Sequence, residues 1–454
     1  MRPAGMAGPP GMQANKPSFR AATSVFENRT YRYLWTSSLF SFTGMQMQMV
    51  ARALLAWNLT GSYGATGIIS VSFGLPMLIF SLVGGSLADR FDKRNLSLMS
   101  MAATGLLALA NAIMLVTGTI TIGWLFVLGL AGGTSAALGM PARMPLMIQV
   151  VGPQNVMAAM AMSTSAMNAT RLVGPALAGA IAGAWNLESV YFIQTGLYAL
   201  SCLTMLAVPA GIGKMPAMMR RQSMWREIGD GLSYVARDKH LRMLNLMMFM
   251  VALFVMPYVA LLAGFVQEDL GKSEGAYGLL QSVSGAGALV ASLGIASLTA
   301  FDRKPLLQWV SGIVGGAGLI GLAVGSAAYG FAGAIAATLV LGLALTVYQT
   351  VNSTLTMDAA RPEMYGRVMS INMLSFSAMP LMALPLGQLA DAIGVRTVLA
   401  AQGTLVIAFM LVMGLLRPGY TFGRTLAASM SPASPAPRAS FREEEEAPAP
   451  AGGN

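Results

Sequence analysis

The chain is long, apolar and sparsely charged. It has 454 residues, of which 55% are hydrophobic and 10% are charged, with a formal net charge of +10. Soluble domains carry about 25% charged residues, so this composition excludes an ordinary soluble domain. The single cysteine, Cys202, excludes an intrachain disulfide, and with one histidine, His240, we find no catalytic, metal-ligand or phosphate-loop constellation. We therefore expect no enzyme, no cofactor and no metal site.

Long apolar blocks separated by short charged runs fill most of the chain. A helix that crosses the hydrocarbon core needs about 20 mostly apolar residues, each of which advances it by about 1.5 Å. Helices satisfy their own backbone hydrogen bonds in lipid, and these blocks lack the alternation of membrane β-strands. The sequence therefore predicts an all-α membrane protein with 12 transmembrane helices. These lie at about 33–58, 64–88, 95–117, 121–143, 156–184, 188–208, 242–265, 275–300, 305–326, 330–353, 366–391 and 394–416.

Lysines and arginines collect on one side of these spans. They precede the first span, follow the second and fill the connection after the sixth, whereas we place only Lys272 and Arg396 on the other side. Because cytoplasmic connections carry the excess of Lys and Arg, we expect both termini in the cytoplasm. This sorting explains the net charge, so we expect the lipid bilayer and no nucleic acid as a partner.

The chain divides into two halves of six spans around the polar stretch 209–241. Within this stretch, residues 224–235 have apolar side chains at helical spacing, which predicts an amphipathic helix on the inner membrane surface. Three features recur in the second half at nearly equal offsets. They are Asp89-Arg90 with Asp302-Arg303, Pro153-Gln154 with Pro362-Glu363, and Pro175 with Pro385. Such duplication is typical of transporters built from two pseudo-symmetric six-helix bundles around a central site.

The expected organisation follows from these boundaries. We predict a disordered N-terminal tail, a first bundle, a cytoplasmic linker, a second bundle and a disordered C-terminal tail. They span 1–24, 25–208, 209–241, 242–416 and 417–454, respectively. The tails are rich in Pro, Gly, Ala and Ser or carry the Glu443–Glu446 run, and cannot bury a core.

The connection after the second span carries the most specific motif, the run from Gly85 to Arg94. This run resembles the signature of the same connection in the major facilitator superfamily at Gly85, Leu87, Ala88, Asp89, Arg90, Lys93 and Arg94. It departs at Asp92, where the superfamily usually has Gly. The run from Arg171 to Gly179 resembles the Gly-Pro motif of its exporters, and 58–62, 141–143, 168–171 and 366–370 resemble the drug:proton antiporter-3 branch, which includes enterobactin-exporter-like proteins.

This resemblance implies more than the residues show by themselves. It implies the major facilitator fold, the inner membrane of a bacterium, a small-molecule cargo and protons as the coupling ion; we expect a monomer. It also implies that Asp89 and Arg90, with Gly85 and Arg94, latch the two halves at the cytoplasmic side. A carboxylate near a helix N-terminus gains about 0.3–1 kcal/mol, and the span 366–391 begins on that side. The open alternative is that this charged run only sets orientation.

Gly174, Pro175 and Gly179 lie within the span 156–184. Proline kinks its helix, and glycines four or five residues apart offer a flat surface to a neighbour. The pattern indicates either a bend that seals the pore or close helix packing alone.

Two arginines are candidates for substrate binding or coupling. Arg171 lies about 15 residues, or roughly 22 Å, into its span, where a cation is retained mainly when it faces a cavity or a partner. Arg52 lies nearer the outer headgroups, and snorkelling is the alternative for both. Arg143 falls at the predicted inner end of its span, which indicates an interfacial anchor. No Asp or Glu occupies the middle of a predicted span, so a positive cavity favours an anionic cargo.

Uncharged polar side chains in the spans are further candidates to face a cavity. They are Gln46, Gln48, Asn168, Gln281, Tyr348, Gln349, Asn352 and Asn372. The alternative for each of them is an interhelical hydrogen bond. The titratable candidates for proton coupling, Asp89, Asp358, Glu188 and Asp391, are all peripheral.

The sequence thus predicts a secondary active, proton-coupled exporter of an amphiphilic drug, siderophore or carboxylated metabolite that works by alternating access. The alternatives are an importer or anion exchanger of the same fold, or a membrane sensor that does not transport.

Overall fold

The computed structural model describes residues 24–209, 211, 224–297, 303–361 and 364–416. Inside the helices, the side chains of 81–90, 366–367 and 372–378 are among those outside the description. The tails predicted for 1–24 and 417–454 fall almost wholly outside it, as do Asp302, Pro362 and Glu363 of the predicted repeat. The described residues form helices joined by short connections, so the all-α prediction is confirmed.

The first half consists of six long helices. They are α2 (Arg29–Thr60), α3 (Tyr63–Arg90), α4 (Lys93–Val116), α5 (Ile122–Val151), α6 (Val156–Ala184) and α7 (Leu187–Leu206), with short 3₁₀ turns at Ser24–Glu27 and Pro153–Asn155. Side chains at the connections fix several starting points. Asn28 caps α2, Asp92 caps α4 and Thr121 caps α5, each by accepting hydrogen bonds from free backbone N–H groups.

The second half makes six further passes. They consist of α9 (Lys239–Phe254) with α10 (Tyr258–Gly264) and the π-helical turn η3 (Phe265–Asp269), α11 (Glu274–Ser297), α12 (Lys304–Ile320) with η4 (Gly321–Gly325), α13 (Ser326–Ala359), α14 (Tyr365–Ile393) and α15 (Val395–Leu416). Gly330 has a φ of 58° inside the range of α13, where the chain reverses direction. The described part of the chain therefore contains the twelve predicted passes.

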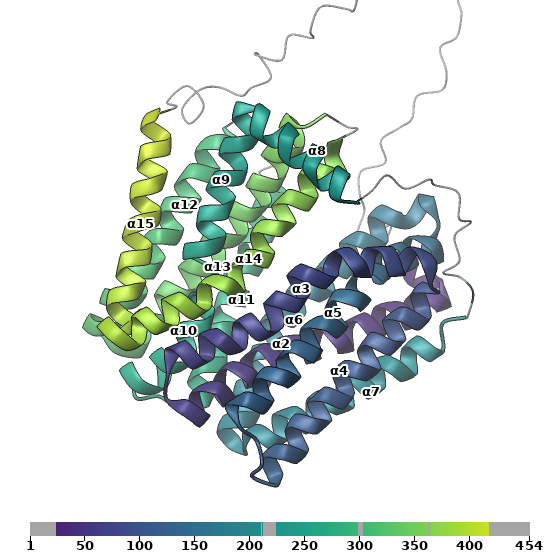
Figure 1. Cartoon of the computed structure of the whole chain (residues 1–454), viewed down its shortest axis with the longest axis horizontal. Helices are drawn as coiled ribbons and strands as arrows, with labels where there is room; N and C mark the ends of the chain where they lie inside the picture. Colours follow the sequence, from purple (N-terminus) through teal and green to yellow (C-terminus); the bar gives the residue numbers. More distant parts are fainter. Residues whose placement is uncertain (1–23, 210, 212–223, 298–302, 362–363, 417–454) are drawn as a thin grey trace, which may run out of the picture.

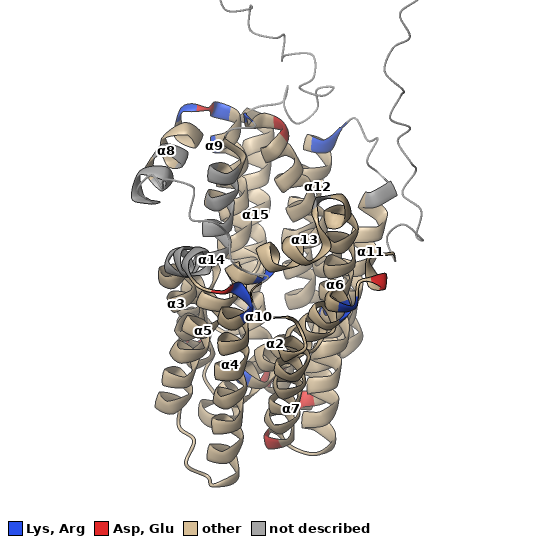
Figure 2. Cartoon of the chain, turned by 90° about the vertical axis from the view of Figure 1, so that its right-hand side faces the viewer, with Lys and Arg blue, Asp and Glu red and all other residues tan. Residues whose placement is uncertain are grey.

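Apolar composition supports membrane insertion of these passes. Among the described residues, 8 helical stretches are long and apolar enough to cross a membrane, and one of them, Lys304–Ala359, includes both α12 and α13. Figure 2 shows long stretches of helix without acidic or basic side chains and charges grouped around α8, α9 and the start of α12. The long helices α2 and α6 fall outside this apolar set, and they carry the predicted candidates Gln46, Arg52, Asn168 and Arg171.

The two bundles meet at one end of the molecule and lean apart toward the other (Figure 1). They meet where α2 connects to α3 and α14 to α15, which we call the α2–α3 end. They diverge toward the end where α8 (Met224–Arg237) lies, which we call the α8 end. Helix α3 packs along α14, and α6 packs along α11, so these two helix pairs make most of the contact between the bundles.

The predicted amphipathic helix is present as α8, and its last turn packs on the second bundle. Val235 is buried beside Leu241 of α9, and the backbone N–H of Arg361 donates to the Tyr234 hydroxyl at 3.2 Å. This end of α8 is therefore held by the connection between α13 and α14.

Candidate functional site

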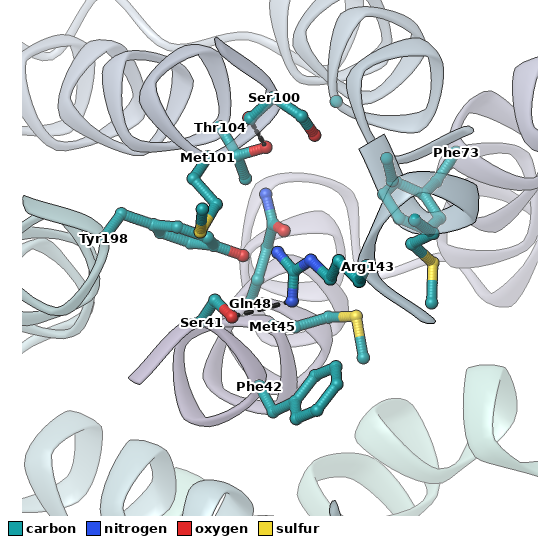
Figure 3. A pocket seen from close by; sticks show the side chains of 13 residues that line it. Ser41, Phe42, Met45, Gln48, Phe73, Ser100, Met101, Thr104, Arg143 and Tyr198 are labelled. Carbon is teal, nitrogen blue, oxygen red and sulfur yellow. Dashed lines mark hydrogen bonds between the residues drawn. The ribbon is translucent and has the colours of Figure 1, made fainter. Parts of the chain in front are cut away.

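A small cavity with both polar and apolar lining lies inside the first bundle, between α2, α3, α4, α5 and α7 (Figure 3). Its volume is about 30 Å³, which is space for about two water molecules. Its polar lining includes Ser41, Gln48, Thr104, Arg143 and Tyr198, and Figure 3 shows several of these side chains directed toward one another. In this conformation the cavity accepts a small polar group rather than a whole organic molecule.

Arg143 brings a positive charge into this cavity. Its Nη1 donates to Ser41 Oγ at 2.8 Å, and its guanidinium lies 5.4 Å from the centre of the Phe42 ring. Its Nε is buried and has no hydrogen-bond partner in the described part of the chain. The predicted position of Arg143, an anchor at a helix end, is wrong because α5 continues two turns further, to Val151.

Arg52 contributes a second positive charge from α2. Its guanidinium lies 4.4 Å from the centre of the Phe73 ring. Such a cation–π contact contributes about 0.5–2 kcal/mol, with the larger values for desolvated pairs. Ion pairs join Lys304 to Asp358 and Arg396 to Asp269, and no ion pair between described residues includes Arg52 or Arg143.

Arg171 lies at a different place, where α6 crosses α11. Its backbone is so close to Gly285 that a Cβ on this glycine would lie 2.6 Å from the Arg171 carbonyl oxygen. The Arg171 residue is exposed although it sits in mid-helix. Its backbone lies at the contact between the two bundles.

The glycines of the exporter-like motif make close helix contacts. A Cβ on Gly174 would lie 2.5 Å from Gln46 Cβ, and one on Gly179 would lie 2.5 Å from the Cα of Gly278 in α11. Pro175 stands between them inside a continuous α6. The motif therefore serves close packing on both neighbours, of which α11 belongs to the other bundle.

The remaining polar candidates have different surroundings. Gln281 donates to the Tyr277 hydroxyl at 3.3 Å, and Asn352 is buried and donates to Leu244 O at 3.0 Å. For Asn352, the structure thus shows the interhelical hydrogen bond that the sequence left as an alternative. Gln48 lines the cavity, Tyr348 is buried, and Asn168 and Gln349 are half-buried. The Asn372 side chain lies outside the described residues.

Asp391, at the end of α14, closes the α2–α3 end. Its Oδ1 accepts from the backbone N–H of Tyr63 at 2.7 Å, and its Oδ2 accepts from Gly64 N–H at 2.9 Å and from Ser62 Oγ at 2.7 Å. A carboxylate of the second bundle thus caps the N-terminus of a helix of the first, where the helix dipole favours negative charge.

Two further hydrogen bonds join the bundles at this end. The Tyr63 hydroxyl donates to Asp269 Oδ2 at 3.0 Å, while Arg396 Nε holds the other oxygen of Asp269 at 3.0 Å. Asn58 Nδ2 donates to Glu274 Oε1 at 2.6 Å.

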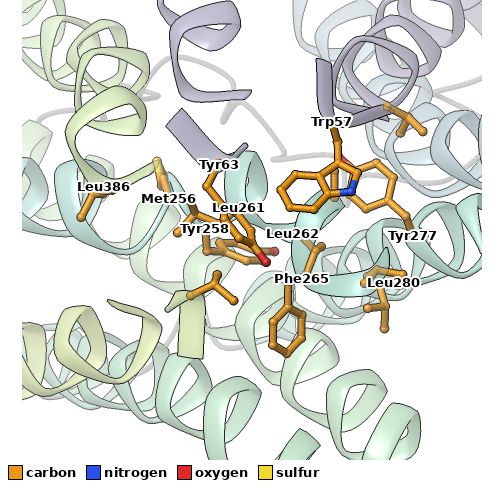
Figure 4. Close-up of a cluster of buried hydrophobic side chains, with 14 of the residues drawn as sticks. Trp57, Tyr63, Met256, Tyr258, Leu261, Leu262, Phe265, Tyr277, Leu280 and Leu386 are labelled. Atoms are coloured by element: carbon orange, nitrogen blue, oxygen red, sulfur yellow. The ribbon is translucent and has the colours of Figure 1, made fainter. Parts of the chain in front are cut away.

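A large buried apolar cluster also lies at the α2–α3 end, where the two bundles meet (Figure 4). Trp57 and Tyr63 of the first bundle pack with 4.7 Å between their ring centres, close to Gly264 of α10. Leu261, Phe265 and Tyr277 of the second bundle belong to the same cluster. Apolar packing and hydrogen bonds therefore close the α2–α3 end together.

The predicted latch lies at the α8 end, where the structure describes only some of the side chains. Gly85, Asp89 and Arg90 belong to the last turns of α3, but their side chains lie outside the described residues. Arg94 donates to Leu206 O at 2.9 Å and thereby ties α4 to α7 within the first bundle. Asp92, the departure from the superfamily signature, caps α4 by accepting from Arg94 N–H at 2.9 Å.

Comparison with known proteins agrees with this architecture. A family model described as transmembrane secretion effector matches residues 20–437. The staphyloferrin A transporter of Staphylococcus aureus is 22% identical over 84% of this chain and 94% of its own length. The multidrug efflux pump Tap of Mycobacterium tuberculosis is 25% identical over 83% and 90%, respectively. The macrolide efflux protein A of Streptococcus pyogenes is 22% identical over 84% and 94%.

Solved structures share the fold at low sequence identity. The nucleoside transporter NupG superposes with a TM-score of 0.68 at 14% identity, covering 86% of this chain and 99% of the other. A bacterial homologue of the lysosomal transporter Spinster gives 0.68 at 12% identity, covering 92% and 100%. With the family model spanning nearly the whole chain, the protein belongs to the transmembrane secretion effector family of the major facilitator superfamily and is a multi-pass membrane transporter, not an enzyme.

Proposed function

We propose that this transporter is a proton-driven exporter that moves an amphiphilic small molecule, such as a drug, a siderophore or a carboxylated metabolite, out of a bacterial cytoplasm. Two relatives support export by their names, an efflux pump for several drugs and an efflux protein for macrolides, and a third is named as a transporter of staphyloferrin A. The observation that carries the proposal is the closure between the bundles at the α2–α3 end.

The closure defines one state of an alternating-access cycle. Hydrogen bonds from Asp391, Tyr63 and Asn58 hold the bundles together at the α2–α3 end, and the bundles diverge toward the α8 end. With both termini in the cytoplasm, this is the state in which an exporter takes up cargo. Rocking of the two bundles then closes the α8 end, where Asp89 and Arg90 hold the alternative state.

Proton coupling is tested by uphill flux in proteoliposomes. We expect that an imposed pH gradient drives accumulation of cargo against its gradient, and that nigericin, which collapses the pH gradient, stops it. The cargo is first selected by growth and thermal-shift screens over siderophores, antibiotics and organic acids. Uphill flux that persists without a pH gradient would assign another coupling ion, and accumulation in the opposite direction would support an importer. A chain that binds ligands but carries no flux would be a sensor.

Arg171 is expected to act on charged cargo because it is an exposed cation in the middle of α6, the helix of the first bundle that packs along α11 of the second. Arg171→Ala should lower the transport of an anionic cargo about tenfold or more, since a hydrogen bond to a charged group contributes about 1.5–3 kcal/mol. Transport of a neutral cargo should change far less, and Arg171→Lys should retain part of the activity. Equal losses for both cargoes would remove this role from Arg171.

A further inference from the structure

Arg143 carries a charge into the interior of the first bundle, and no carboxylate among the described residues pairs with it. Transfer of an unpaired charge from water to a protein interior costs several kcal/mol, so such a group lowers the stability of the fold. In membrane proteins, ionised side chains within the spans are retained mainly where they serve a substrate or ion pathway. The position of Arg143 therefore requires a functional explanation.

The groups around Arg143 are neutral and can form hydrogen bonds. Ser41 accepts one guanidinium N–H, and Gln48 and Tyr198 line the same cavity with exposed fractions of 6% and 5%. A guanidinium has five N–H donors in a planar fork that matches the two oxygens of a carboxylate. Only the bond to Ser41 is formed among the described residues, so donors remain for an anion.

The rest of the lining is aromatic and thioether-rich. Phe42 and Phe73 contact the guanidinium groups of Arg143 and Arg52, respectively, and Met45, Met101 and Met140 complete the apolar part. Methionine adapts its shape to irregular apolar ligands. Since the cavity is only about 30 Å³, it admits the acidic group while the apolar body lies outside.

We propose that Ser41, Gln48, Arg143 and Tyr198 form a subsite, the Arg143 pocket, that binds the carboxylate of an amphiphilic organic anion, with Arg52 as a second positive charge nearby. This inference rests on the proposed function, because it names the chemical class of the exported cargo. It assigns the charge recognition to the first bundle alone, which keeps the anion bound while the second bundle moves.

The test measures binding to the full-length protein in nanodiscs by thermal shift. The probes are aromatic monocarboxylates, such as naphthoate, each paired with its neutral carboxamide. We expect the carboxylates to raise the unfolding temperature of the wild type and the carboxamides to have little effect. Arg143→Met should weaken carboxylate binding about ten- to a hundredfold, and Arg143→Lys should retain part of it. Arg32→Met, which removes an exposed arginine from the same helix as Ser41, is the matched control.

The unfolding temperature of Arg143→Met without ligand distinguishes a binding role of Arg143 from a structural one. Because Arg143 is an unpaired interior charge, Arg143→Met should unfold without ligand at the same or a higher temperature than the wild type. A large drop in that temperature, or failure of the variant to fold, would make Arg143 a structural residue and overturn the proposal. Equal stabilisation of the wild type by carboxylates and carboxamides, or by neither, would overturn it as well.

Two further measurements identify the class of anion that binds and distinguish failure of the pocket from failure of the export proposal. Replacing chloride with methanesulfonate, an anion without a carboxylate, at fixed ionic strength should leave the carboxylate response intact. If chloride itself gives the same protection, the pocket binds an inorganic anion and the cargo assignment fails. Carboxylate binding without flux in proteoliposomes would contradict export but leave the pocket in place. Flux of cargo without any preference for carboxylates would contradict the proposed pocket but leave the export proposal in place.

Discussion

Replacement of Gly179 by leucine is expected to reduce transport at least tenfold. Helices α6 and α11 approach so closely that a Cβ at this position would lie 2.5 Å from the Cα of Gly278 and 3.0 Å from its backbone nitrogen. Backbone atoms cannot rotate away as a side chain can, so the larger residue must push the two bundles apart. Overpacking of a close contact typically costs about 1–3 kcal/mol, and here the cost falls on the state that is closed at the α2–α3 end.

The shift in conformation can be measured apart from the loss of flux. Leu386 is buried in the apolar cluster at the α2–α3 end, and Cys202 is the single natural cysteine. In a Cys202→Ser background, Leu386→Cys should react with a membrane-impermeant maleimide faster when Gly179→Leu is also present. Gly196→Leu is the matched control, because a Cβ there meets no atom within 4 Å. Normal flux and unchanged labelling in Gly179→Leu would show that this contact does not limit the closed state.

Removal of the Asp391 carboxylate is expected to open the same end by a different route. Asp391→Ala leaves two backbone N–H groups of α3 and the Ser62 hydroxyl without their acceptor. For an exposed carboxylate at a helix N-terminus, we estimate a loss of about 1–2 kcal/mol. That is roughly a five- to thirtyfold shift in the equilibrium between the two states, with a comparable fall in turnover. Asp391→Asn keeps one acceptor oxygen and should have an intermediate effect.

Two comparisons make the Asp391 result specific. Glu188→Ala removes a carboxylate at the same end that makes no hydrogen bond to the second bundle among the described residues, and it should leave labelling of Leu386→Cys unchanged. Asp89→Asn weakens the proposed latch at the α8 end, so it should slow the labelling where Asp391→Ala accelerates it. A shift in the same direction for both variants would contradict the assignment of opposite states to the two ends.

The sequence predicted the spans well and their ends less well. The apolar blocks located every pass, because a span must be long and continuously apolar in either half. The fourth span was ended at Arg143, where a charge follows Pro141, but α5 runs through Pro141 and Pro145 to Val151. Proline is tolerated in a membrane helix when neighbouring groups satisfy the freed backbone. Because the predicted span ends two helical turns too early, Arg143 is placed at the membrane surface and not in the interior of the bundle.

The closure at the α2–α3 end was missed for a different reason. From the sequence, a carboxylate is expected at the start of the span 366–391, and Asp391, at its end, is only a peripheral titratable group. In the structure Asp391 caps the helix that begins at Tyr63, 328 residues away, and no local pattern indicates that these two helix ends meet. The methionines and aromatic residues around Arg143 were equally hard to assign, since their grouping depends on five helices.

The attachment of α8 to the second bundle makes it possible to measure how fast the bundles move relative to each other. Because Tyr234 and Val235 hold its last turn, a fluorophore on Leu232, which is 56% exposed, should report the movement of that bundle. A second dye on Met99 of α4, which is 69% exposed, marks the first bundle. Energy transfer between the two dyes in single molecules would then time each half-cycle directly, before any cargo has been identified.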